Sequence, residues 1–342
     1  METKIINVEE IDEAAKLLQA GELVAFPTET VYGLGADALN REAVSQVYQA
    51  KGRPSDNPLI VHVADFAQVQ EFVKEIPQAA KTLVEKFWPG PLTLIFNVKV
   101  GSLPSEVTGG LTTAAFRMPN NEVTLELIKK SGTVLVGPSA NTSGKPSPTT
   151  AQHVFHDLNG KIAGIVDDGQ TRIGVESTVL DLSVEGVATI LRPGAITQEM
   201  LLDVVPGVSL DKHLVSEEEA PKAPGMKYTH YSPNAEVYMI NEENTDWQEA
   251  IDWAKKQNLT VGLLADRSIT DKFGKEVDAT YELTNFHNVY SASQNLFAGL
   301  RALDEKQPKI AVIFTETFDS HGLGSAYMNR LQKASGQKYF KK

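Results

Sequence analysis

Cysteine is absent from the 342 residues, which excludes disulfides, thiolate nucleophiles, zinc ribbons and iron–sulfur ligation. No apolar run approaches the roughly 18 residues that cross a bilayer, and the N-terminus has neither a basic start nor a signal-like apolar stretch. Basic residues are fewer than acidic ones, 32 against 44, and a net charge of −12 disfavours non-specific binding to a nucleic-acid backbone. We expect a cytoplasmic protein with no membrane partner and no strong direct nucleic-acid binding.

The length predicts two domains, because a domain usually has roughly 100–200 residues. The composition changes over residues 206–235, which contain four prolines, the acidic run Glu217–Glu219 and no sustained hydrophobic period. We therefore predict a first domain over 1–205, a linker over 206–235 and a second domain over 236–342.

Short apolar runs alternate with helical patterns along the whole chain. In the first domain they predict strands at 23–26, 59–63, 92–98, 112–117, 133–137, 164–166, 178–182 and 188–191. Periodic segments predict helices at 8–20, 41–50, 66–74, 78–87, 122–130 and 151–159. The second domain shows strands at 237–240, 260–264, 279–283 and 310–314, with helices at 247–257, 289–303 and 325–334. We expect an α/β protein: a mixed sheet first, then a small three-layer sandwich with a mostly parallel, Rossmann-like sheet.

Two glycine-rich segments invite familiar nucleotide-binding interpretations. Gly33–Ala38 matches G-x-G-x-x-A, which would suit a nicotinamide-dependent oxidoreductase, but polar residues separate it from the preceding strand where a tight turn should follow at once. Gly137–Pro146 has six residues between its glycines and a proline where the P-loop requires Ser or Thr, so it is not a Walker A motif.

Polar residues concentrate instead at the ends of predicted strands. Pro27–Gly35 supplies hydroxyls and a carboxylate, Lys51–Pro58 supplies two cations, and Arg117 ends a strand. Pro138–Thr150 is rich in Ser, Thr and Asn, with glycines that expose backbone N–H groups. Each segment alone reads as a loop, but ligands of open α/β sheets bind at strand ends. Together the segments predict a site for an anionic, nucleotide-like ligand.

Seven motifs, spread in order over nearly the whole chain, resemble those of the threonylcarbamoyl-adenylate synthases. They are PTETVYGLG (27–35), KGRPSDNPLIVH (51–62), FWPGPLT (87–93), FRMP (116–119), PSANTSGKPSPTT (138–150), GVESTVLDL (174–182) and LRPGAI (191–196). Two later segments, APGMKYTHYSP (223–233) and GLGSAYMNRLQKAS (322–335), are similar to the longer, two-domain form of that family. The resemblance implies a YrdC-like synthase domain followed by the Rossmann-like domain.

The resemblance also implies a reaction, in which L-threonine, bicarbonate (or carbon dioxide) and ATP form threonylcarbamoyl-AMP and pyrophosphate. Other proteins, a tRNA threonylcarbamoyl transferase machinery, then use the product to modify an adenosine beside the anticodon. Mg²⁺ is expected on the ATP phosphates, with no direct protein ligand. The family's K-x-R…S-x-N tetrad falls on Lys51, Arg53, Ser139 and Asn141, the implied catalytic residues.

The resemblance implies roles for further residues as well. For threonine they are Thr30, His62, Arg117, Ser139 and Ser177. For ATP they are Lys51, Arg53, Asn57, Thr113, Asn141, Thr149, Arg192 and Tyr231. No covalent enzyme intermediate is required, because orientation and electrostatics can carry most of the rate.

The linker motif around Tyr231 has two interpretations: packing between domains, or a lid over 224–233 that closes on the nucleotide and protects labile intermediates from water. An RNA-binding module is an alternative function, although the first 210 residues carry 16 basic and 25 acidic residues, a net charge of −9. The second domain shows no catalytic cluster and could be an interaction or regulatory module.

Overall fold

The structure, a computed structural model, describes residues 2–211, 221–222, 230–241 and 247–340. The chain forms two compact units. The first comprises Met1–Ser143, Ser147–Arg172 and Glu176–Tyr228, and the second comprises Gly144–Pro146, Ile173–Val175 and Thr229–Lys342. Within the described ranges, no helix is both long enough and apolar enough to cross a membrane.

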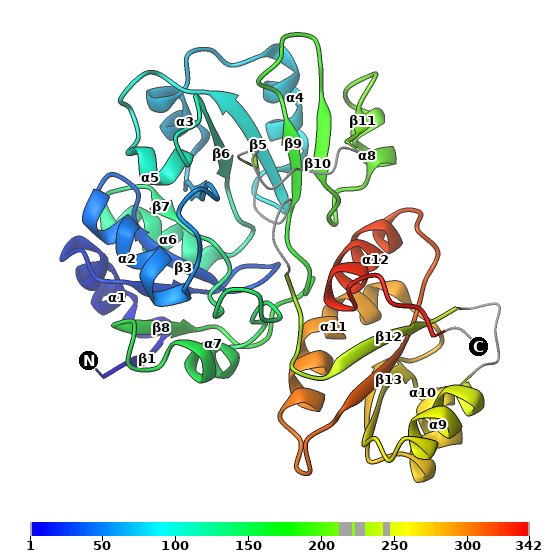
Figure 1. The fold of residues 1–342 in the computed structure, drawn as a ribbon. Coiled ribbons are helices and arrows are strands. Elements are labelled where there is room, and N and C mark those ends of the chain that lie inside the picture. Colours follow the sequence, from blue (N-terminus) through cyan, green and yellow to red (C-terminus); the bar gives the residue numbers. More distant parts are fainter. Residues whose placement is uncertain (1, 212–220, 223–229, 242–246, 341–342) are drawn as a thin grey trace. The chain divides into compact units, whose positions relative to one another are not determined.

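The first unit is built on a mixed sheet, which has eleven strands in the described residues (Figure 1). They are β1 (Lys4–Asn7), β2 (Val24–Phe26), β3 (Gly33–Asp37), β4 (Ile60–His62), β5 (Leu92–Asn97), β6 (Thr113–Arg117), β7 (Leu135–Val136), β8 (Gly164–Asp167), β9 (Thr178–Asp181), β10 (Thr189–Arg192) and β11 (Ser209–Leu210). Their order in the sheet is β1-β8-β2-β3-β7-β4-β6-β5-β9-β10-β11. The sheet contains both parallel pairs, such as β4/β6, and antiparallel pairs, such as β5/β6, as expected for a mixed sheet.

Helices cover one face of this sheet along most of its width. The helices of the unit are α1 (Ile11–Gln19), α2 (Arg41–Lys51), α3 (Phe66–Phe72), α4 (Gln78–Phe87), α5 (Ser105–Thr108), α6 (Glu122–Ser131), α7 (Ala151–Leu158) and α8 (Gln198–Leu202), with a 3-10 turn η1 (Val8–Glu10). Apolar side chains of α2, α3, α4 and α7 pack on one set of alternate strand positions, which includes Val61, Leu94, Phe116 and Leu180. Burial of this set is the main driving force for the unit.

The opposite face is covered differently along its two halves. Helices α1 and α6 pack on Val24, Phe26, Leu135 and Val166 of one half. On the other half, the intervening positions of β4, β5, β6 and β9 form a small cluster of strand residues, Ile60, Ile95, Ala115 and Val179. Because side chains alternate between faces with a period of two, His62, Thr93, Arg117 and Ser177 lie on the same face as this cluster. Three predicted site residues, His62, Arg117 and Ser177, thus lie on the half of this face that holds the small cluster of strand residues.

The second unit is a parallel sheet between two helical layers. Its strands are β12 (Glu236–Ile240), β13 (Val261–Asp266), β14 (Ala279–Thr284) and β15 (Val312–Glu316), in the order β12-β15-β13-β14. Its helices are α9 (Trp247–Lys256), α10 (Arg267–Phe273), α11 (Val289–Asp304) and α12 (Leu323–Ala334), with a 3-10 turn η2 (Gly274–Glu276). Helices α9 and α10 bury Ile251 and Phe273 against Leu263 on one face, and Gly299 of α11 packs against Leu264 on the other. The predicted three-layer, parallel arrangement is confirmed.

Three strands differ from the sequence expectations. Gly33–Asp37 is strand β3, paired on both sides by β2 and β7, so the glycine-rich segment is not a dinucleotide-binding turn. Lys4–Asn7 forms β1, for which no strand was predicted. Ser209–Leu210 forms β11 against β10, inside the segment predicted as linker. The domain boundaries themselves stay predictions.

Candidate active site

Lys51 is the last residue of α2, and its ammonium group is buried against the loop that carries Ser139 and Asn141. Gly52 adopts φ 62, a left-handed conformation that ends the helix directly after Lys51. The Nζ atom donates to the carbonyl oxygen of Ser139, to that of Asn141 (2.7 Å) and to Asn141 Oδ1 (3.4 Å). Three of the four tetrad residues are therefore in direct contact, and Lys51 fixes the backbone of the loop.

Arg53, the fourth tetrad residue, contacts its own loop. Its Nη2 atom donates to the carbonyl oxygens of Asn57 (3.3 Å) and Pro58 (3.1 Å). Tyr48 Oη also donates to the Asn57 carbonyl, and the Asn57 side chain is buried. The guanidinium thus shapes the turn that presents Asn57.

Arg117 ends strand β6 as a buried cation with three contacts. Its Nε donates to the carbonyl of Gly90 (3.3 Å) and its Nη1 to Thr30 Oγ1 (2.9 Å). Its Nη2 lies 2.6 Å from Glu29 Oε2. A guanidinium has more N–H donors than these contacts use, so donors remain on the terminal nitrogens for a ligand carboxylate. Glu29 was not among the predicted site residues.

His62 is the register partner of Arg117 on the adjacent strand β4. Its ring stands edge-on to Phe26 at 5.3 Å and lies directly against Gly137, where a Cβ atom would be 2.6 Å from Nδ1. Burial, and after it the positive charge of Arg117, lower the pKa of His62 to about 3. The imidazole is therefore neutral across the physiological pH range, and it can exchange hydrogen bonds with a substrate without adding charge.

Ser177, just before strand β9, joins a second polar group on the same face. Its hydroxyl lies 2.8 Å from Thr93 Oγ1 and accepts from Arg192 Nη2 (3.1 Å), while Arg192 Nε donates to the Ser177 carbonyl (3.1 Å). Thr113 shares this sheet face through the alternation of β6 but lies at the far end of the strand from Arg117. Nothing joins Thr113 to the other predicted residues in the described contacts.

Thr149 is fully buried and precedes the first residue of helix α7 by two positions. Its backbone N and its Oγ1 both face His153 Nδ1, at 3.3 and 3.4 Å. Two residues earlier, Ser147 Oγ donates to Glu176 Oε1 (2.5 Å), which links the loop to the residue before Ser177. His153, Glu176 and Thr93 were not predicted. The contacts of Glu176 and Thr93 join residues distant in the sequence, and such contacts leave no periodic signal in it.

Tyr231 belongs to the second unit, in a left-handed conformation at φ 67. Its buried ring stands 5.0 Å from that of Phe297 on α11. The predicted lid over 224–233 lies in part outside the described residues, because 223–229 are not described. A contact between Tyr231 and a nucleotide stays a prediction.

Acidic and imidazole side chains are dispersed across both units. Within the described ranges, no group of three or more His, Asp or Glu residues could hold a metal ion. The donors in the site are instead ammonium, guanidinium, hydroxyl and amide groups, which suit carboxylate and phosphate oxygens.

Comparison with known proteins resolves the family. A family model described as "Telomere recombination" (Sua5_yciO_yrdC) matches residues 16–194, and one described as "Threonylcarbamoyl-AMP synthase, C-terminal domain" matches residues 196–336. The chain belongs to the threonylcarbamoyl-AMP synthase family. The resemblance inferred from the motifs is thereby confirmed over both domains.

Relatives within this family match almost the entire chain. The threonylcarbamoyl-AMP synthase of Bacillus subtilis is 46% identical, over 96% of this chain and 94% of the relative. That of Pyrococcus abyssi is 45% identical, over 99% of each chain. A crystal structure of the P. abyssi protein complexed with L-threonine superimposes with a TM-score of 0.92, at 43% identity and 99% coverage of both chains. The two-domain α/β fold expected for the long form of the synthase family is confirmed.

Proposed function

We propose that this protein synthesises L-threonylcarbamoyl-AMP from L-threonine, bicarbonate or carbon dioxide, and ATP, with release of pyrophosphate. The observation that carries the proposal is the full-length match to a relative solved with L-threonine, together with the buried cations of the same sheet face. The protein would then be a cytoplasmic nucleotidyltransferase. Its product would pass to the machinery that modifies tRNA beside the anticodon.

In this proposal, the residues around Arg117 bind threonine. Its guanidinium binds the substrate carboxylate, while hydrogen bonds for the amine and hydroxyl come from Thr30, His62, Ser139 and Ser177. The neutral His62 can accept or donate there without repelling the substrate ammonium. Fixing the amine beside the carbon donor would make carbamate formation effectively unimolecular.

In this proposal, the tetrad and its neighbours bind the nucleotide. Lys51 supplies positive charge and also positions the loop of Ser139 and Asn141, since three oxygens of that loop surround its Nζ atom. The remaining ATP contacts are assigned to Arg53, Asn57, Thr113, Thr149, Arg192 and Tyr231. Both reactants are anions, so fixed cations are needed to bring the carbamate oxygen to the α-phosphorus.

Mg²⁺ fits this donor set only as a companion of the ATP phosphates. The described residues offer no cluster of carboxylates or imidazoles to ligate it. When bound, the ion would neutralise phosphate charge. The chain's own residues would bind and orient the three substrates.

Pyrophosphate release from ATP and Mg²⁺ tests the proposal, measured with and without L-threonine and bicarbonate. Release should require both. Lys51→Ala and Arg53→Ala should abolish most of it, whereas Lys74→Ala, which removes an exposed lysine of the same unit, should not. Threonine-independent release, or full activity in both tetrad variants, contradicts the proposal.

A further inference from the structure

Glu29 places a carboxylate in the interior of the first unit, next to Arg117. The residue is only 4% exposed, and its Oε2 atom lies 2.6 Å from Arg117 Nη2. Among the described residues neither buried carboxylate oxygen makes a hydrogen bond: Oε2 has only this ion pair, and Oε1 has no partner of either kind. Burial of a carboxylate is unfavourable unless its oxygens are satisfied, so the second oxygen calls for a donor.

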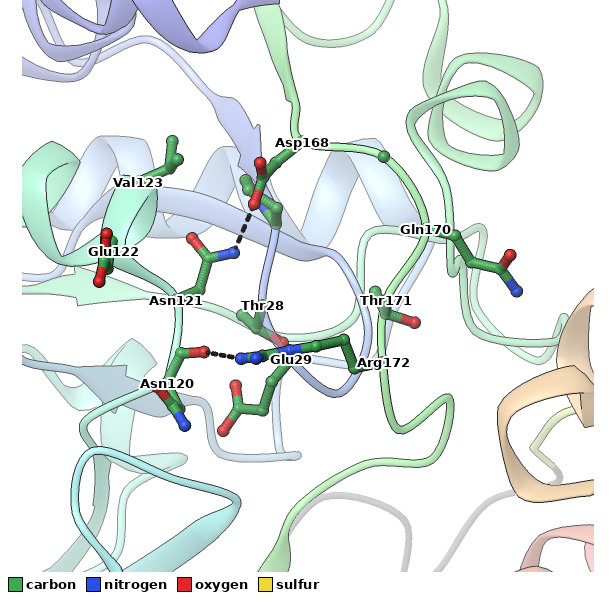
Figure 2. Close-up of a pocket in the computed structure, with 12 residues that line it drawn as sticks. Thr28, Glu29, Asn120, Asn121, Glu122, Val123, Asp168, Gln170, Thr171 and Arg172 are labelled. Carbon is green, nitrogen blue, oxygen red and sulfur yellow. Dashed lines mark hydrogen bonds between the residues drawn. The ribbon is translucent and has the colours of Figure 1, made fainter. Parts of the chain in front are cut away.

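Glu29 is also one of the residues that line a pocket of about 350 Å³ beside the loop of Thr28, a pocket that Arg117 itself does not line (Figure 2). Asn120 and Asn121 form part of the wall, and Arg172 is held at its edge by the Asn120 carbonyl (2.8 Å). The charge of Glu29 is balanced by Arg117, and the rest of the wall carries two carboxylates, of Glu122 and Asp168, against the guanidinium of Arg172, an excess of one negative charge. A cationic group entering this pocket meets Glu29 as its buried acceptor.

We infer that Glu29 binds the α-ammonium group of the amino-acid substrate and, with Arg117, makes this site selective for a zwitterion. The inference rests on the proposed function. In it, the substrate carboxylate binds the donors that remain on Arg117, and the substrate ammonium donates to Glu29 Oε1.

Charge balance supports this arrangement. The Glu29–Arg117 pair is neutral, which makes its burial tolerable before a ligand arrives. An anionic hydroxy acid on Arg117 would add an uncompensated negative charge next to Glu29. An amino acid adds both charges at once, each beside its opposite, and the buried site stays neutral.

Calorimetric titration of the full chain with two ligands tests the inference. The ligands are L-threonine and 2,3-dihydroxybutanoate, which carries a hydroxyl in place of the ammonium group. The unaltered chain should prefer threonine. In Glu29→Gln, threonine should bind about 10- to 100-fold more weakly, because a charge-assisted hydrogen bond is lost. The hydroxy acid should bind equally well or more tightly, because Arg117 no longer has a competing carboxylate.

The opposite direction of the two shifts separates recognition from a merely structural role, which would weaken both ligands together. Glu122→Gln, an exposed change on the wall of the same pocket, is the matched control and should leave both affinities unchanged. If Glu29→Gln does not fold, Glu29→Asp serves instead, because it keeps the negative charge but shortens the side chain by one methylene. In that variant the binding of threonine should weaken and the binding of the hydroxy acid should not.

The inference is overturned if Glu29→Gln weakens the binding of both ligands together, or if selectivity is unchanged in the variant that folds. In either case, threonine binding by the unaltered chain still supports the proposed function. Failure of the unaltered chain to bind threonine overturns both.

Discussion

Replacing His62 by Gln should remove a pH-dependent part of the stability of the first unit. Burial holds the pKa of His62 near 3, whereas an unfolded histidine titrates near 6.5. Between these two pKa values the unfolded state binds a proton at His62 and the folded state does not. The stability that comes from keeping His62 neutral is therefore present above pH 6.5 and is lost as the pH falls toward 3. Between pH 7.5 and pH 5.0 the linkage relation gives a loss of about 2 kcal/mol from this one residue.

Urea unfolding at the two pH values measures this loss. Trp88 reports on the first unit when Trp247 and Trp253, both in the second unit, are replaced by Phe in every protein compared. The fall in unfolding free energy from pH 7.5 to 5.0 should be about 2 kcal/mol smaller in His62→Gln than in its parent. All other histidines are common to both proteins and cancel. An equal fall in the two proteins would refute the conclusion that His62 is buried in its neutral form.

Three further changes test other parts of the site. Gly137→Ala places a methyl group 2.6 Å from His62 Nδ1. Overpacking of this kind should lower the free energy of unfolding in urea by about 1–3 kcal/mol and should reduce pyrophosphate release. A variant as stable and active as its parent would contradict the close approach. Lys51→Met leaves buried carbonyls of the Ser139–Asn141 loop without their donor, which should destabilise the unit by about 1–3 kcal/mol in thermal unfolding, whereas Lys74→Met should have no such effect. Deleting residues 224–233 should leave the first unit folded and weaken ATP binding in calorimetry, and an unaltered affinity would argue against a lid.

Periodicity predicted the parts of the fold in which a side chain's face follows from its position. Apolar runs predicted strands close to the observed β4 and β6, whereas the register that makes His62 and Arg117 neighbours on one face is seen only in the structure. Strand β3 escaped prediction because Gly33–Asp37 is poor in β-formers. It is a strand because β2 and β7 pair with it on both sides, a tertiary effect that outweighs local propensity.

Contacts made by loops and backbone atoms could not be predicted from the sequence. The motif resemblance identified Lys51, but not that its ammonium group binds backbone carbonyls, since every residue carries a carbonyl and none is marked in the sequence. Glu29 stood in a quoted motif without a role, because its pairing with Arg117 joins positions 88 residues apart (117 − 29) through the fold alone.

The partners of Lys51 and Arg117, the two most buried cations among the described residues of the first unit, indicate that each serves a different substrate. Arg117 has a carboxylate at 2.6 Å, so its charge is cancelled locally, and the pair suits a ligand that is neutral overall but carries both signs. The described contacts of Lys51 are with carbonyl and amide oxygens, which orient its ammonium group. A positive charge of that kind attracts a polyanion at a distance even when its N–H groups are already bonded, because the Coulomb interaction needs no direct contact. Exchanging the two environments would misdirect both substrates: an acid next to Lys51 would repel triphosphate, and an unpaired Arg117 would accept hydroxy acids as readily as threonine.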